Sequence, residues 1–352
     1  MALAAVRRGH EATIFTGSVD GNIPAEIKVV LLHVKALTNH GKALEFTRLF
    51  AEKVEEFQFD AAVAFNRIPG CDFYFAADNC YAAEMPKKHC RWVLKHFPRY
   101  RTYLELEKAV FSPGVPCNIF YLAEKQKRDY QISYHTEENR FILLPPGINP
   151  ACCRTADADA RRAAKRAELG IGDDVKLMLL VGSNYRLKGV DRALLAIAAL
   201  PEKVKEKICF LIVGQSRDKF VRRMIKKLDL IDQVRILGSR QDVPDLLLAA
   251  DLLLHPARNE AAGTVLAEAI SSGLPVVCSG ECGFADLVEA SGGSVVPKNF
   301  DQGIFDQLVA AALGDLDDLR RKAIEYSATV DYTRRAETAL DAVESFVARR
   351  NA

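Results

Sequence analysis

The feature that most constrains the fold is a regular alternation in the second half of the chain, where short apolar runs take turns with amphipathic segments. The runs predicted as strands are residues 177–181, 208–213, 234–237, 252–254 and 276–278, and the predicted helices between them are residues 190–200, 217–228, 243–250 and 264–272. Continuous apolar strands joined by helices are typical of a parallel sheet that is buried on both faces. The pattern therefore predicts an α/β fold with a doubly wound sheet.

The first half repeats this alternation less regularly. Its predicted strands are residues 13–15, 27–33, 61–65, 118–122 and 141–144, and its predicted helices are residues 43–56 and 124–134. Pro145-Pro146-Gly147 and the Ala-, Arg- and Asp-rich stretch 151–168 are typical of a linker. A chain of 352 residues is long enough for two cores. We therefore expect two similar α/β domains, residues 1–147 and 148–330, and a C-terminal helix within residues 331–352 that packs back toward the first domain.

The chain begins unusually for such a domain. MALAAVRRGHEATIF reads as the end of an amphipathic helix, a stop at Gly9 and then a strand. A doubly wound domain normally opens with a strand and a glycine-rich turn before its first helix. We therefore expect that strand, its loop and part of the helix to lie upstream of Met1, because a variant without the strand would leave an apolar sheet edge uncovered.

Composition limits which kinds of partner and which cellular compartment are expected for this chain. The net charge is +2 and the pI is about 8.0, so any electrostatic partner must be sought in local patches. The nine cysteines form no CxxC pair of the kind that structural zinc uses, which favours reduced thiols and no metal site. No apolar run approaches the roughly 20 residues that span a bilayer, and the start lacks a signal peptide. We expect a cytoplasmic protein.

The run NEAAGTVLAE places Glu260 and Glu268 on either side of a predicted helix start at Gly263 or Thr264. A helix start offers free N–H groups that suit phosphate, and a glycine lets a ligand approach the backbone. Carboxylates accept hydrogen bonds from paired hydroxyls, so the two glutamates suit a sugar and a ribose at separate parts of one long ligand. The alternative is that Glu260 caps the helix and Glu268 forms a surface ion pair.

A second loop, VGSNYRLKGVD, follows a predicted buried strand and carries Arg186 and Lys188. Cations at this position can meet anionic phosphates, although two solvated loop cations are the alternative. The backbone near residues 236–239 could contact a planar base. Neither GxGxxG nor GxxxxGK[ST] occurs, which weakens dinucleotide and P-loop interpretations.

Residues 250–275 resemble the donor-binding segment of the retaining glycosyltransferases of family 4, with their E-x7-E motif. Together with VGSNYRLKGVDR, PPGI, TNHG and CDFYFAADNCY, the chain resembles the lipopolysaccharide core glucosyltransferases of that family over nearly its whole length and in matching order. The resemblance implies the GT-B fold, in which two Rossmann-like domains face one another across a cleft. It also implies that the second domain holds most of a UDP-sugar.

The resemblance implies roles for individual residues. Glu268 would hold the ribose, Arg186 and Lys188 the pyrophosphate, and Glu260 with the backbone of residues 261–263 the hexose. The implied donor-binding residues are Gly182, Arg186, Lys188, Ile236, Ala261, Ala262, Gly263, Thr264 and Glu268, and the implied catalytic residues are Glu260 and Asp78. Asp78 would orient the sugar or the acceptor, and His40 is a possible acceptor-side contact; a capping aspartate and a turn histidine are the alternatives.

The implied reaction transfers glucose from UDP-glucose to a heptose (heptose II) of the lipopolysaccharide inner core, with retention and an α-1,3 linkage. Neither a metal nor a cofactor beyond the donor is implied. Front-face attack and a covalent intermediate on Glu260 both stay open, as do another hexose or acceptor. Two departures from the family pattern occur. Arg186 and Lys188 are neither adjacent nor five apart, so the phosphate role is better supported for Lys188 than for Arg186. The N-terminal Gly-Gly loop of relatives is absent, and this keeps a truncated UDP-sugar-binding module without turnover open.

Between residues 81 and 111, cations alternate with aromatic residues. The residues predicted to contact a membrane are Lys87, Lys88, Arg91, Trp92, Lys95, Arg99 and Arg101. Such a segment suits an interface with anionic lipid, and the alternative is a solvated helix whose aromatics pack on its own domain. The resemblance favours peripheral binding to the cytoplasmic face of the inner membrane. Because no nucleic-acid motif accompanies the segment, nucleic acid is not an expected partner.

Overall fold

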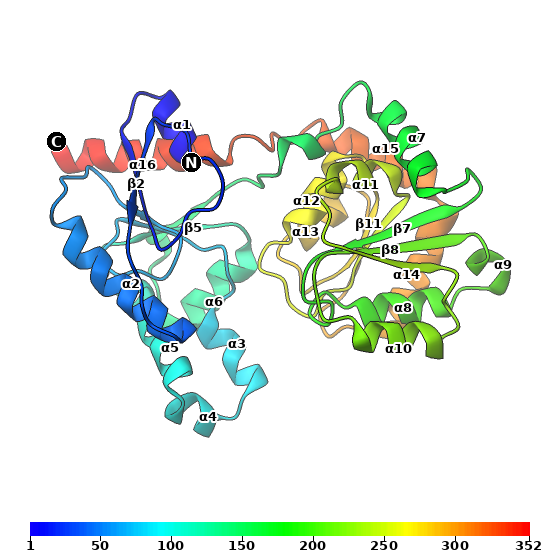
Figure 1. The fold of residues 1–352 in the computed structure, drawn as a ribbon, viewed down its shortest axis with the longest axis horizontal. Coiled ribbons are helices and arrows are strands. Elements are labelled where there is room, and N and C mark those ends of the chain that lie inside the picture. Colours follow the sequence, from blue (N-terminus) through cyan, green and yellow to red (C-terminus); the bar gives the residue numbers. More distant parts are fainter. The chain divides into compact units, whose positions relative to one another are not determined.

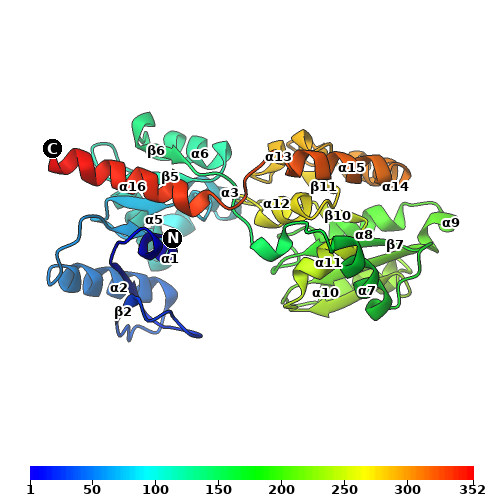
Figure 2. The same cartoon turned by 90° about the horizontal axis from the view of Figure 1, so that it is seen from above.

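The computed structural model describes residues 1–352, except for the side chains of Lys87, Lys88 and Arg91. The chain divides into two compact units, each built of parallel strands and helices (Figures 1 and 2). Unit 1 consists of Met1–Pro145 and Arg334–Ala352, and unit 2 of Pro146–Thr333. The prediction of an α/β fold is confirmed.

Unit 2 contains one parallel sheet of six strands in the order β12-β11-β10-β7-β8-β9. Its strands are β7 (Lys176–Val181), β8 (Ile208–Val213), β9 (Val234–Gly238), β10 (Leu252–His255), β11 (Val276–Ser279) and β12 (Ser294–Val296). The chain reverses direction across the sheet between β9 and β10, so β7 and β10 are neighbours although two strands separate them in sequence. The carboxyl ends of these two strands therefore lie at a topological switch point.

Helices cover both faces of this sheet (Figure 1). They are α7 (Ala158–Leu169), α8 (Val190–Ala198), α9 (Glu202–Lys205), α10 (Lys219–Lys227), α11 (Val243–Ala249), α12 (Thr264–Ser271), α13 (Ala285–Ala290), α14 (Gln302–Gly314) and α15 (Leu316–Ser327). Strands β8 and β10 are buried along their whole length, as their unbroken apolar sequences predict. Side chains from α8, α10 and α14 share one core with alternate strand residues such as Leu180 and Phe210.

The stretch 151–168 is not a linker, and this prediction is wrong. Most of it forms helix α7, which packs on α11. Arg162 Nη1 donates to the carbonyls of Leu248, Ala249 and Ala250 at the end of α11, and its Nη2 pairs with Asp251 at 2.5 Å. Arg162, one of the charged residues that suggested a linker, instead satisfies carbonyls that the end of α11 leaves free.

Unit 1 contains two parallel sheets, one of strands β1-β2 and one of strands β3-β4-β5-β6. The strands are β1 (Ala12–Thr16), β2 (Ile27–Leu31), β3 (Val63–Ala64), β4 (Phe73–Phe75), β5 (Asn118–Tyr121) and β6 (Phe141–Leu143). Strand β4 had not been predicted, whereas the predicted range 141–144 contains β6. The expectation of a further strand upstream of Met1 stays a prediction.

The helices of unit 1 include both ends of the chain. They are α1 (Ala2–Arg7), α2 (Asn39–Val54), α3 (Tyr81–Lys88), α4 (Arg91–His96), α5 (Pro98–Phe111), α6 (Glu124–Tyr134) and α16 (Arg335–Asn351). Helix α16 lies beside α1 in both views (Figures 1 and 2), and Arg8 forms ion pairs with Glu337, Asp341 and Glu344 of α16. The units meet in sequence at residues 145 and 333, where the predicted boundaries were 147 and 330.

Candidate donor-binding site

The loops that follow β7 and β10 bring Lys188 and Glu260 together. Lys188 Nζ forms an ion pair with Glu260 Oε2, and the exposed fractions of the two side chains are only 18% and 17%. Both residues stand at the carboxyl edge of the sheet, one before α8 and the other before α12. A cation and a carboxylate from distant parts of the sequence thus form one charged pair at the switch point.

Glycines make this close approach possible. Gly182 has φ +151°, and a Cβ there would lie 2.8 Å from Cε of Lys188, whose side chain lies over it. Gly189 has φ +74°, and a Cβ there would overlap the carbonyl oxygen of Pro256. Gly189 is therefore needed for the close approach of the two loops, and Gly182 leaves room for the Lys188 side chain within its own loop.

Hydrogen bonds fix the loop that carries Glu260. Arg258 forms a bidentate pair with Asp191 of α8 at 2.8 and 2.6 Å, and its backbone N–H donates to the carbonyl of Leu187 at 2.8 Å. Arg192 Nη1 donates to the carbonyl of Pro256 at 3.1 Å. Planar guanidinium groups hold such geometry well, so the start of this loop is tied firmly to the loop that carries Lys188.

His255, the last residue of β10, also contacts Glu260. Its Nε2 lies 3.3 Å from Glu260 Oε2, and its side chain is fully buried. This histidine was not among the residues predicted for the site. The available signal was an imidazole at the end of a predicted strand, five residues before a candidate site carboxylate.

The surroundings of Glu260 keep its carboxylate ionised. Burial by itself would raise the pKa of Glu260, but the hydrogen bond with His255 and the charge of Lys188 outweigh that effect and hold the pKa at about 2. At neutral pH the group can therefore only accept hydrogen bonds, and it suits a ligand that offers hydroxyl groups.

Helix α12 begins as the sequence predicts, with Gly263 in a left-handed conformation at its N-cap. The backbone amides of residues 261–264 donate to no acceptor within the part of the chain that the structure describes. Free amides at the positive end of a helix are a suitable place for an anionic group. They lie in sequence directly after the Glu260 carboxylate.

Glu268 lies in α12 and has different surroundings. Burial raises the pKa of its carboxyl, and a hydrogen bond from the backbone N–H of Asn149 opposes this rise only in part. Glu268 has no cation of its own comparable to the Lys188 that pairs with Glu260 within the described residues. The two glutamates of the E-x7-E pattern thus occupy chemically distinct positions.

Comparison with known proteins identifies the family. Residues 161–330 match the family model described as glycosyl transferases group 1. The lipopolysaccharide glucosyltransferase WaaG of Escherichia coli (strain K12) is 37% identical to this chain over 314 residues, which are 89% of the chain and 84% of WaaG. This chain belongs to the WaaG family, within glycosyl transferases group 1.

Solved structures agree with this assignment. A crystal structure of WaaG, described as a glycosyltransferase involved in lipopolysaccharide biosynthesis, matches with a TM-score of 0.90 at 36% identity and covers 97% of this chain and 93% of WaaG. A sucrose-phosphate synthase from Thermosynechococcus elongatus matches at 19% identity with a TM-score of 0.77, over 100% of this chain and 92% of its own. The second likeness shows the fold alone. The predicted GT-B fold, with two Rossmann-like domains, is confirmed.

In this WaaG homologue, other residues of unit 2 that were predicted to bind the donor form fewer contacts. Arg186 is exposed, and the structure gives a contact only for its carbonyl oxygen, which accepts a hydrogen bond from Arg258 Nη1 at 2.7 Å. Ile236 lies in β9, half-buried against the core. The donor-binding roles of both residues stay predictions.

The predicted residues of unit 1 lie in local networks of their own. Asp78 is largely exposed, and its Oδ2 lies 3.7 Å from Nη1 of Arg67, which in turn donates through Nε to the buried Glu107 at 3.0 Å. His40 lies in the first turn of α2 with Nε2 3.4 Å from Oγ1 of Thr38, the N-cap residue. The assigned roles of Asp78 and His40 stay predictions.

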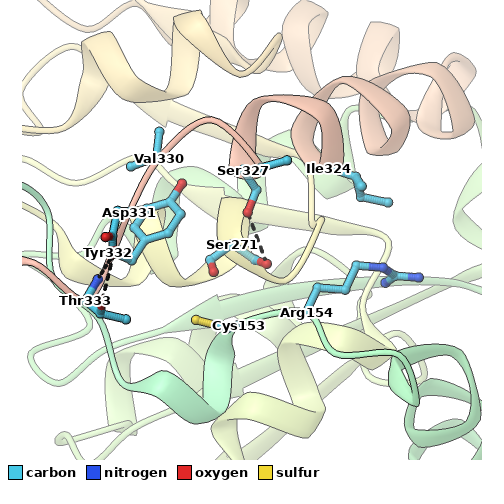
Figure 3. A pocket seen from close by; sticks show the side chains of 10 residues that line it. Cys153, Arg154, Ser271, Ile324, Ser327, Val330, Asp331, Tyr332 and Thr333 are labelled. Atoms are coloured by element: carbon cyan, nitrogen blue, oxygen red, sulfur yellow. Dashed lines mark hydrogen bonds between the residues drawn. The ribbon is translucent and has the colours of Figure 1, made fainter.

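A cavity of about 350 Å³ lies in unit 2 where α12 ends, lined by Ser271, Ile324 and Tyr332 among others (Figure 3). Ser327 Oγ points toward the carbonyl of Ser271 at 3.5 Å on one side of it, and the Tyr332 ring lies on another. No residue predicted for the donor site lines this cavity. It therefore does not extend the Lys188–Glu260 site at the opposite end of α12.

Within the described part of the chain, no group of three or more His, Cys, Asp or Glu side chains could hold a metal ion. All nine cysteines are free thiols. No described helix is both long enough and apolar enough to cross a membrane. The prediction of a transfer reaction that needs no metal is not tested by these observations.

Proposed function

We propose that this WaaG homologue transfers glucose from UDP-glucose to heptose II of the lipopolysaccharide inner core, with retention of configuration and an α-1,3 linkage. The observation that carries the proposal is the largely buried Lys188–Glu260 pair beside the amides of residues 261–264, which have no acceptor among the described residues. It occurs in a chain 37% identical to a lipopolysaccharide glucosyltransferase. Because WaaG is a lipopolysaccharide glucosyltransferase, the similarity supports glucose as the sugar and lipopolysaccharide as the acceptor class.

In the proposed reaction, the UDP leaving group gains negative charge as the bond to glucose breaks. The Lys188 ammonium and the amides at the start of α12 are fixed donors that would stabilise this charge, without a metal ion. The ionised Glu260 would accept hydrogen bonds from glucose hydroxyls, and Glu268 from the ribose hydroxyls. In unit 1, Asp78 would orient the sugar or the acceptor, and His40 would contact the acceptor.

We further propose that α4 and the start of α5 bind anionic lipid at the cytoplasmic face of the inner membrane. Trp92 and Phe97 are 62% and 49% exposed, which is unusual for aromatic side chains. Lys95, Arg99 and Arg101 are exposed around them. The side chains of Lys87, Lys88 and Arg91, which belong to the same prediction, lie outside the described residues.

The test of the proposed reaction is to incubate the protein with UDP-glucose and a core oligosaccharide that ends in heptose, and to measure UDP release and product mass. We expect both only when donor and acceptor are present together. Parallel reactions with UDP-galactose and with a core lacking heptose II test the choice of hexose and acceptor. UDP-glucose binding without transfer would contradict the proposal and identify a sugar-nucleotide-binding module.

The membrane proposal is tested by sedimentation with vesicles that contain an anionic phospholipid. We expect binding that falls steeply as salt rises, and a further loss in a W92A/K95E double variant. K203E is the matched control, because Lys203 is an exposed cation on α9 of unit 2. Equal binding by both variants, or binding that does not respond to salt, would contradict this proposal.

A further inference from the structure

Glu260 uses only one of its two carboxylate oxygens within the protein. Both Lys188 Nζ and His255 Nε2 reach Oε2. An oxygen of an ionised carboxylate offers about two lone-pair directions, so these two donors occupy Oε2 fully. Oε1 has no hydrogen-bond partner among the residues that the structure describes.

The imidazole of His255 fits one tautomer. Its ring is fully buried, and Nδ1 has no partner among the described residues. A proton on Nδ1 would be a buried donor without an acceptor, and Nε2 would then direct a lone pair at an anionic oxygen. A neutral ring with its proton on Nε2 avoids both costs and donates to Glu260.

We propose that His255 is a positioning residue of the donor site: its Nε2–H and the Lys188 ammonium together saturate Oε2 of Glu260, leaving Oε1 to accept a hydrogen bond from one hydroxyl of the donor hexose. This inference rests on the proposed function. Because an ionised carboxylate oxygen cannot donate, the recognised group of the sugar must carry a hydrogen of its own. A fluorine or a methoxy group at that position is therefore rejected.

The backbone around His255 supports a fixed ring. His255 pairs with Cys278 in the parallel register of β10 and β11, and its carbonyl accepts from the N–H of Ala257 at 2.8 Å. Cys282, whose Sγ lies 3.8 Å from the same carbonyl, also forms an isolated parallel bridge with Glu260. The imidazole and the carboxylate that it contacts are thus both anchored to β11 and the turn after it.

The test compares His255→Gln with His255→Leu. Glutamine keeps an N–H donor of similar reach, whereas leucine keeps the apolar bulk and removes the donor. For H255L we expect the Kd for UDP-glucose to rise about ten- to hundredfold, the loss typical of a hydrogen bond to a charged group, with the Kd for UDP within about twofold of wild type. For H255Q we expect both constants to stay close to wild type.

Titration calorimetry measures both constants, and thermal melting shows whether each variant folds. Equal losses in H255Q and H255L, or parallel losses for UDP and UDP-glucose, would overturn the positioning role. Unchanged UDP-glucose binding in H255L would overturn it as well. Failure of the wild-type protein to bind UDP-glucose would instead overturn the proposed function, so the two failures are distinguishable.

A second arm uses donor analogues with a single deoxyfluoro substitution at each glucose hydroxyl in turn. We expect one analogue to bind the wild-type protein weakly. Its affinity for H255L should be little lower still, because the hydrogen bond that His255 supports is already missing. Additive losses for every analogue would contradict the assignment of Oε1 to one hydroxyl.

Discussion

Glu260 and Glu268 are the same residue type, eight positions apart, yet their surroundings push their pKa values in opposite directions. Lys188 and His255 overcome burial at Glu260 and hold its pKa at about 2. At Glu268 burial dominates and raises the pKa, with only one backbone N–H to oppose it. Partners inside the protein balance the charge of the Glu260 carboxylate, whereas the Glu268 carboxylate still needs hydrogen-bond donors.

The difference teaches that a sequence motif with two identical residues can contain two unlike sites. Glu260 is fixed before any ligand arrives, so it is preorganised to select a hydroxyl. Burial destabilises the charged form of Glu268, and in the proposed function the ribose hydroxyls of the donor would offset this cost. A shared role for the two carboxylates in acid–base chemistry on one atom does not follow from this arrangement.

The largest expected effect comes from Glu260→Gln. We expect the rate of glucose transfer to fall about hundredfold, because the amide cannot replace an ionised acceptor and leaves Lys188 without its counter-charge. The Kd for UDP should stay within about twofold of wild type. Steady-state kinetics and calorimetry measure the two quantities.

Glu289→Gln, an exposed change on α13, is the matched control for these measurements. A loss of UDP affinity as large as the loss of transfer would show that Glu260 serves the nucleotide, and would remove the contrast with Glu268.

The same variant should lose stability in a pH-dependent way. Since the native pKa of Glu260 lies below the usual 4.5, its ionised form stabilises the wild type above pH 4.5, and that contribution disappears as pH falls toward 2. We expect E260Q to have a free energy of unfolding lower by up to about 3 kcal/mol at pH 7, with the difference shrinking at pH 3. Urea unfolding at both pH values measures it. A difference independent of pH would argue that lost packing, rather than charge, causes the effect.

For Glu268→Gln we expect the Kd for UDP to rise about tenfold, because the amide is a weaker acceptor for ribose hydroxyls than a carboxylate. The Kd for UDP-glucose should rise by the same factor, since in the proposed site Glu260 and not Glu268 holds the hexose. Calorimetry with both ligands checks this expectation. A loss of affinity for UDP-glucose but not for UDP would mean that Glu268 contacts the hexose and Glu260 the ribose.

The smallest expected effect is the change in the free energy of unfolding caused by E268Q, and its sign should be opposite to that of E260Q. The raised native pKa of Glu268 means that its charge destabilises the folded state at high pH, a penalty that fades as pH falls through that pKa toward 4.5. We expect E268Q to be slightly more stable than wild type at pH 8, with the gain lost near pH 4.5. Urea unfolding at the two pH values measures the gain. Lower stability at both pH values would mean that the bond with Asn149 outweighs the cost of burial.

Much of unit 2 could be predicted because its strands are long, apolar and buried on both faces. The predicted ranges 208–213 and 234–237 agree with β8 and β9 to within one residue. In unit 1 the predicted range 61–65 contains the two residues of β3, whereas β4 was not predicted. Helix α7 was missed because its charged residues bind carbonyls of α11, a partner that is distant in sequence.

The residues of the site could be predicted from the sequence, but the contacts between them could not. Glu260, Lys188 and the helix start were visible as local patterns, and the structure brings them to one edge of the sheet. The pairing of Lys188 with Glu260 depends on β7 lying beside β10, which sequence order does not reveal. His255 was overlooked because a histidine at the end of an apolar strand has no meaning until the carboxylate that it contacts is known.

The division of the chain also has a consequence for damage to its coding sequence. Unit 2 is one continuous segment, whereas unit 1 is completed only by Arg334–Ala352. A premature stop codon just after Thr333 would therefore leave the sequence of unit 2 intact and remove part of unit 1. Arg8 would lose three carboxylate partners, and Phe73 in β4 would lose its ring contact with Phe346 at 5.3 Å. Residues 334–352 are thus needed to complete the unit that contains residues 1–145.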